Sequence, residues 1–145
     1  NVQPSLARRK DGSLIAFMRD NGDAPGRVMI SISTDEGESW TAATDSNLPN
    51  PGASVEALVL DDGRWLMIMN DSDQNRANLS IVISEDEGKN WTKKRVLESA
   101  RMAAGKFSYP SIIQGNDGQI HLTYSYHVRS GTSIKYISIN SQDLH

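Results

Sequence analysis

Two arginines are the first candidates for chemistry in this sequence. Arg19 closes an alternating apolar run, LIAFMR, and Arg76 precedes another, ANLSIVIS. Two guanidinium groups that converge from neighbouring elements present forked donors to a carboxylate, a geometry that lysine cannot match. A single arginine is more often a solvated loop residue with its stem along the protein surface. The role of the pair therefore depends on the elements that position it.

Those elements repeat along the chain with a period of about 50 residues, which is typical of propellers and solenoids. The segments PSLARRKDGSLIAFMRD, SVEALVLDDGRWLMIMND and YPSIIQGNDGQIHLTYSY each carry an Asp-Gly pair between two apolar runs. The pairs are Asp11-Gly12, Asp62-Gly63 and Asp117-Gly118. An Asp-Gly pair between strand-like runs predicts a tight hairpin, because the turn requires a positive φ that glycine adopts without steric cost.

A third alternating run follows each hairpin, and in the first two units a turn is repeated after it. SISTDEGESW, residues 31–40, returns as VISEDEGKNW, residues 82–91. In such a turn the aspartate accepts hydrogen bonds from nearby backbone amides, and the tryptophan packs back over the hairpin. We interpret Asp35 and Asp86 as structural rather than catalytic, because a catalytic site made at two equivalent places would be two sites.

The strand pattern extends over the whole chain, and no segment shows the apolar spacing of a helix over three turns. Each unit fits a four-stranded antiparallel meander, which is the size of one propeller blade. We therefore predict an all-β fold of about three blades, a partial propeller, at residues 1–46, 47–100 and 101–145, with three strands in the last. Propellers close with about 4 to 8 blades, so we expect a missing propeller half or self-association.

The repeated turns also carry a family resemblance. Their pattern, Ser-x-Asp-x-Gly-x-x-Trp, falls on Ser33, Asp35, Gly37 and Trp40, and again on Ser84, Asp86, Gly88 and Trp91. This pattern is similar to the Asp-box, or bacterial neuraminidase repeat (BNR), of the sialidase (neuraminidase) superfamily. Segments from about residue 3 to residue 139 resemble successive segments of sialidase-like proteins. The resemblance implies a six-bladed propeller, of which this chain is about the C-terminal half.

Antiparallel geometry assigns residues to the two ends of a blade. If each first strand runs from top to bottom, the Asp-Gly hairpins and the repeated turns lie at the bottom. Arg19, Arg76 and Tyr109 then lie at the top. Sialidases hold the sugar carboxylate with three arginines, and the resemblance implies that Arg19 and Arg76 are the second and third of these. Tyr109, in FSYPSII, matches the position of the sialidase tyrosine nucleophile.

The general base is where the sequence departs from the sialidase pattern. A phenol with a pKa near 10 is a weak nucleophile at neutral pH and needs an adjacent base. Sialidases use a glutamate, but the corresponding place here holds Gln3, whose neutral amide cannot take a proton. Gln3 is therefore expected to contact the substrate only. Glu56 is the nearest candidate replacement for the base, and a salt bridge at the rim is an alternative role for it.

The leading functional hypothesis is a sialidase-like exo-glycosidase that hydrolyses a terminal acidic sugar, sialic acid or a related one, from glycoconjugates. On this hypothesis the full-length protein is an enzyme, and these residues alone are inactive. One alternative is a non-catalytic, carbohydrate-binding Asp-box propeller. Another is a glycosidase for a different acidic sugar, such as a uronic acid. The expected partner is an acidic carbohydrate in each case.

Composition argues against other partners. The net charge is −3 and the basic residues are scattered, so nucleic acid is not expected. No run approaches the roughly 18 apolar residues of a membrane span, so a membrane is not expected either. The sequence has no cysteine and no metal-ligand spacing, and we expect neither a metal nor a cofactor. The compartment stays open, although a bacterial sialidase-like protein would be secreted or periplasmic.

Overall fold

The computed structural model describes residues 2–100 and 104–144, and within these ranges it contains eleven β-strands in three antiparallel sheets. The first sheet contains β1 (Val2–Arg8), β2 (Leu14–Arg19), β3 (Arg27–Ser33) and β4 (Thr44–Pro49). The second contains β5 (Glu56–Val59), β6 (Trp65–Met69), β7 (Asn78–Ser84) and β8 (Lys93–Ser99). The third contains β9 (Gly105–Gln114), β10 (Gln119–Val128) and β11 (Gly131–Asn140), and a 3₁₀ turn, Ser141–Asp143, follows it.

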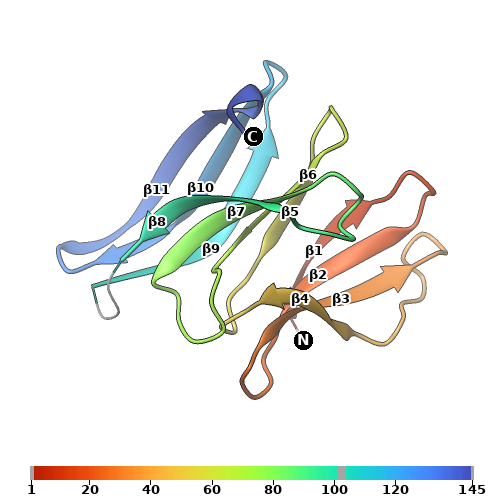
Figure 1. Cartoon of the computed structure of the whole chain (residues 1–145), viewed down its shortest axis with the longest axis horizontal. Coiled ribbons are helices and arrows are strands. Elements are labelled where there is room, and N and C mark those ends of the chain that lie inside the picture. Colours follow the sequence, from red (N-terminus) through yellow and green to blue (C-terminus); the bar gives the residue numbers. More distant parts are fainter. Residues whose placement is uncertain (1, 101–103, 145) are drawn as a thin grey trace.

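The three sheets lie side by side, with the first (red to orange) and the third (cyan to blue) on opposite sides of the second (Figure 1). Within each sheet the strands pair in chain order, as a meander does. The prediction of an all-β fold built from antiparallel blades is thus confirmed. Among the described residues, no helix has the length and hydrophobicity to cross a membrane. The expected unit ends at Asn1, Arg101 and His145 fall outside the described residues.

The two inner strands of the middle sheet, β6 and β7, are buried on both faces. All five residues of β6 are buried, and their side chains alternate between two cores. Leu66 and Ile68 pack in a core with side chains of the third sheet. Trp65 and Met67 pack in a separate core with side chains of the first sheet. This explains why the segment WLMIM is continuously apolar rather than alternating, since a strand between two layers has no solvent face.

The two outer sheets leave large apolar side chains exposed. On the first sheet, Leu6 is 53% exposed and Trp40 is 38% exposed, and both line a hollow of about 380 Å³. On the third sheet, Ile134 is 69% exposed and Tyr136 is 58% exposed. Surfaces of this kind mark sites of further packing or association. What covers them, a missing propeller half or a second copy, stays a prediction.

The first repeated turn is closed by its own side chains. The Ser33 hydroxyl accepts a hydrogen bond from the Gly37 amide (2.9 Å) and donates one to Asp35 Oδ1 (2.8 Å). The hydroxyl and backbone amide of Ser39 also donate to the Asp35 carboxylate, and the Trp40 indole donates to the Gly37 carbonyl (3.0 Å). These bonds, those from Ser39 first, lower the pKa of Asp35 to about 2.

The second repeated turn repeats the hydrogen bonds made by the serine and the aspartate of the first. Ser84 accepts from the Gly88 amide (2.9 Å) and donates to Asp86 Oδ1 (2.8 Å). Asn90 takes the place of Ser39 and donates to Asp86 from its side chain (2.6 Å) and its backbone (2.8 Å). These bonds lower the pKa of Asp86 to about 2 as well. Both carboxylates are therefore ionised at neutral pH and occupied within their own turns.

We expect Gly88→Ala to lower stability more than Gly37→Ala. Both glycines have a positive φ (78° and 91°), so an alanine at either position costs about 1–2 kcal/mol of backbone strain. A Cβ at Gly88 would also lie 3.1 Å from the Trp65 ring and 3.2 Å from Phe17, whereas a Cβ at Gly37 would meet nothing closer than 3.7 Å. Overpacking of this kind lowers the stability by about a further 1–3 kcal/mol. Urea unfolding of the two variants measures the difference, and equal losses would contradict this packing.

Candidate functional site

Strand register separates the repeated turns from the candidate site. Leu14, at the start of β2, pairs with Ser33, so the first repeated turn lies at the end of the sheet that carries the Asp-Gly hairpin. Arg19, at the other end of β2, pairs with Val2. In the second sheet Trp65 pairs with Ser84 in the same way. The turns and Arg19 therefore lie at opposite ends of the blades.

Arg19 is held by two neutral side chains. Its Nη1 donates to Gln3 Oε1 (3.1 Å), and its Nε donates to Asn21 Oδ1 (3.0 Å). Gln3 has a φ of 57° and lies where the pairing of β1 with β2 shifts register between Val2 and Ser5. No ion pair to Arg19 occurs within the described ranges, so the positive charge of its guanidinium is not neutralised. The sequence predicted a substrate contact for Gln3. The structure shows that Gln3 contacts Arg19.

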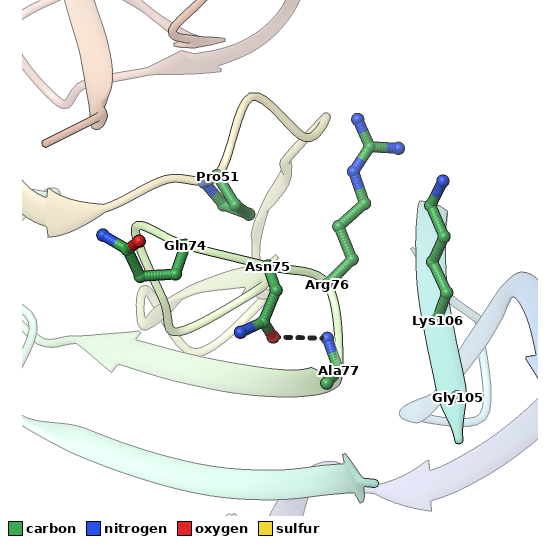
Figure 2. A pocket seen from close by; sticks show the side chains of 7 residues that line it. All are labelled: Pro51, Gln74, Asn75, Arg76, Ala77, Gly105 and Lys106. Atoms are coloured by element: carbon green, nitrogen blue, oxygen red, sulfur yellow. Dashed lines mark hydrogen bonds between the residues drawn. The ribbon is translucent and has the colours of Figure 1, made fainter. Parts of the chain in front are cut away.

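Arg76 lines a hollow of about 560 Å³ at the same end of the blades. Its Nη2 donates to the Gly52 carbonyl (2.8 Å), and its own carbonyl accepts a hydrogen bond from the Phe107 amide (2.9 Å). Figure 2 shows that the side chains of Arg76 and Lys106 extend from the hollow in the same direction. The hollow is lined by Pro51, Gln74, Asn75, Arg76, Ala77, Gly105 and Lys106. Lys106 was not a sequence candidate, and its position three residues before Tyr109 is the only signal that the sequence offers.

Asn50 connects the two arginines, although the sequence analysis did not single it out. Its side chain is fully buried, and its Oδ1 accepts hydrogen bonds from the amides of Asp20 (3.3 Å), Gly52 (2.9 Å) and Ala53 (3.1 Å). Its Nδ2 donates to the Ala53 carbonyl (2.8 Å). A buried amide that is hydrogen-bonded through both its oxygen and its nitrogen rigidifies its surroundings. Asn50 thus links two segments. One is the loop whose Gly52 carbonyl accepts a hydrogen bond from Arg76, and the other is Asp20, the residue that follows Arg19.

Tyr109 lies in β9 with its side chain 53% exposed. Its φ is 52°, and the pairing of β9 with β10 shifts register at this point, between Thr123 and Ser125. Like Gln3, it is followed by a proline. Within the described part of the chain, no hydrogen bond joins the Tyr109 hydroxyl to an arginine or to a carboxylate.

Glu56 is the first residue of β5, and its side chain is half-buried. Burial raises the pKa of its carboxyl group above the ordinary value. Neither a salt bridge nor a hydrogen bond from its side chain to Tyr109 occurs among the residues described. A raised pKa makes a carboxylate a better proton acceptor, but no hydrogen bond joins the Glu56 carboxyl group to the Tyr109 phenol among the described residues. Its role, like that of Tyr109, stays a prediction.

The same part of the chain offers no metal centre, because the described residues contain no group of three or more histidine, aspartate or glutamate side chains that could hold an ion.

The BNR repeat-like domain family matches residues 1–122. The chain belongs to this family. Comparison with curated protein sequences finds no match. The family assignment confirms the resemblance to sialidase-like BNR propellers that the repeated turns carry.

Solved structures show the same fold at low sequence identity. The NanB sialidase of Streptococcus pneumoniae, in complex with 2-[(3-chlorobenzyl)ammonio]ethanesulfonate, matches with a TM-score of 0.77 and 17% identity over 98% of this chain and 24% of that one. A polysaccharide lyase of family PL25, an ulvan lyase bound to -[GlcA(1-4)Rha3S]-, matches with a TM-score of 0.70 and 17% identity over 99% and 39%. The α-L-arabinanase of Penicillium chrysogenum, complexed with arabinobiose, matches with a TM-score of 0.68 and 17% identity over 96% and 46%. This BNR repeat-like chain thus spans less than half of each of these proteins.

We expect Glu56→Gln to raise the melting temperature at pH 7 and to change it little at about pH 4. The pKa of Glu56 is raised in the folded state, so its stabilising contribution is fully present below the unfolded pKa and is lost as the pH rises through the folded pKa. At pH 7 the buried carboxylate therefore disfavours folding, and an amide removes that cost. The exposed Glu38→Gln is the matched control, with little change expected at either pH. A melting temperature for Glu56→Gln at or below that of the unmodified protein at pH 7 would contradict this account.

Proposed function

We propose that this chain binds the carboxylate of an acidic sugar through Arg19 and Arg76, as part of a glycoside-processing propeller. The observation that carries the proposal is the state of Arg19, whose side-chain partners among the described residues are the neutral amides of Gln3 and Asn21. A guanidinium without a carboxylate partner keeps its full charge for a ligand. Arg76, which uses Nη2 for the Gly52 carbonyl, has no other side-chain partner among the described residues.

The polar surroundings of the two arginines support a carbohydrate as the rest of the ligand. The hollow on the other side of Pro51, of about 300 Å³, is lined by Asp20, Asn21 and Asp73 among others. Carboxylate and amide oxygens of this kind accept hydrogen bonds from sugar hydroxyls. The BNR repeat-like family and the sialidase, lyase and arabinanase neighbours support the same class of ligand.

Gln3 determines which chemistry is proposed for the bound sugar. In sialidase-type hydrolysis, Tyr109 attacks the anomeric carbon while a carboxylate removes the phenolic proton. Gln3 cannot remove that proton, and its amide instead accepts from Arg19. We therefore propose that the complete protein binds acidic sugars but hydrolyses ordinary sialosides slowly. The second candidate is turnover of a different acidic sugar with Glu56 as base, which the raised pKa of Glu56 favours.

Binding is tested by calorimetry on the full-length protein with N-acetylneuraminic acid, galacturonic acid and, as a neutral comparison, galactose. We expect at least one acidic sugar to bind, and Arg19→Ala or Arg76→Ala to weaken that binding about tenfold or more, because each removes a charge-assisted hydrogen bond. Arg8→Ala is the matched control, since Arg8 is paired with Glu36 (2.8 Å) at the opposite end of the blade. Binding of the acidic sugars that survives Arg76→Ala unchanged would overturn the proposal.

Hydrolysis is tested separately with a fluorogenic sialoside. We expect slow turnover by the unmodified full-length protein and an increase of about 10²-fold in Gln3→Glu, which restores a group able to accept the proton. Tyr109→Phe is expected to remove the activity of both proteins. Full activity that survives Tyr109→Phe would exclude Tyr109 as the nucleophile, and rapid turnover by the unmodified protein would contradict the role given to Gln3.

A further inference from the structure

A second hollow adjoins the one at Arg76. It has a volume of about 260 Å³ and is lined by Ala104, Gly105, Lys106, His127, Val128 and Arg129. The two hollows share Gly105 and Lys106 and therefore adjoin at the start of β9; together they are called the depression below.

The backbone fixes the floor of this depression. Lys106 pairs with His127 and Gly105 pairs with Val128 in the register of β9 with β10. The hydrogen bond from the Phe107 amide to the Arg76 carbonyl (2.9 Å) ties the start of β9 to the second sheet. The position of Lys106 between the two hollows is therefore set by strand pairing on one side and by this bond on the other.

The charges that line the depression have one sign. Arg76, Lys106 and Arg129 are cations, no carboxylate is among the described residues that line either hollow, and none of the three forms a salt bridge within the described ranges. At the opposite end of the blades, by contrast, Arg8 and Arg64 pair with carboxylates at 2.8 and 2.7 Å. Cations that share a depression repel one another, and a bound anion relieves that repulsion.

From this arrangement we infer that the ligand carries a second anionic group, bound by Lys106 and Arg129 on the sugar unit next to the one at Arg76. The inference rests on the proposed function and names its substrate class, a saccharide with a carboxylate or sulfate on each of two adjoining units. The charges also predict on which side of the Arg76 unit the second sugar unit lies. Asp20 and Asp73 line the hollow on the other side of Pro51 and disfavour an anion there. Arg129 supplies a planar fork for the second anion, and Lys106 supplies a point charge between the two.

The test compares an acidic monosaccharide with its dimer on the full-length protein. Galacturonic acid is compared with digalacturonic acid, and N-acetylneuraminic acid with its α2,8-linked dimer. For the acid that binds, we expect the dimer to bind about tenfold tighter or more. Arg129→Gln, which changes the second hollow alone, is expected to reduce that gain and to leave binding of the monosaccharide within about twofold, and the double variant with Lys106→Gln is expected to remove the gain. Arg8→Gln combined with Lys10→Gln makes the same change in net charge at the opposite end, and we expect it to leave both affinities unchanged.

The outcomes separate this inference from the proposed function. Suppose that Arg76→Ala abolishes binding of the monosaccharide. If the unmodified protein then binds the dimer no tighter than the monosaccharide, or if the double variant still binds the dimer more tightly, the second anion site is wrong and the proposed function stands. If Arg76→Ala leaves both sugars bound, the proposed function itself is wrong. Should the double variant fail to fold, the salt dependence of the unmodified protein decides, because two bound anions require a steeper loss of affinity with salt than one. Equal salt dependence for monomer and dimer would then overturn the inference.

Discussion

Burial of β6 and β7 on both faces of the second sheet is the constraint on which the rest of the molecule depends. β6 supplies Leu66 and Ile68 to one core and Trp65, Met67 and Met69 to the other. Because interiors are close-packed, neither outer sheet can slide along the second without opening a cavity. The three first strands are therefore held in fixed positions relative to one another. The loops at the end of the blades that carries Arg19 and Arg76 are therefore anchored to a rigid framework.

The two ends of the blades use their polar groups in different ways. At the end with the repeated turns, carboxylates accept hydrogen bonds from their own turns or pair with Arg8 and Arg64. At the other end, Arg19 and Arg76 are positioned by amide and carbonyl oxygens instead. Neutral acceptors orient a guanidinium without cancelling its charge. The fold thus pairs Arg8 and Arg64 with carboxylates at one end and leaves Arg19 and Arg76 without a carboxylate partner among the described residues at the other.

Local signals in the sequence predicted much of this architecture. Asp-Gly pairs predicted the hairpins, and alternation of apolar residues predicted the strands. Antiparallel geometry predicted that Arg19 lies at the end of the blade away from Asp35, as the strand register shows. The contacts that complete the site lie beyond such signals. Lys106 lies near Arg76 because the amide of the next residue, Phe107, donates to the Arg76 carbonyl across the second and third sheets. The side-chain oxygen of Asn50 accepts hydrogen bonds from three backbone amides.

Backbone conformation at two site residues was also beyond sequence reasoning. A residue before a proline favours an extended conformation, yet Gln3 and Tyr109 precede prolines and both have positive φ. Non-glycine residues in this region occur mostly where the surrounding structure enforces them. Here the register shifts of β1 and β9 are that surrounding structure.

Gln3 and Tyr109 occupy the same place in their repeats, eight residues before the aspartate of the Asp-Gly pair, and Ser54 occupies that place in the second sheet. The Ser54 hydroxyl is buried and has no hydrogen-bond partner among the described residues. Gln3 and Tyr109 share a positive φ and a shift of strand register at this place, whereas Ser54 lies before β5 and has neither. The same backbone geometry thus presents an amide in the first sheet and a phenol in the third. Equivalent positions of a repeated blade can therefore carry different chemical groups without any change in the order of the strands.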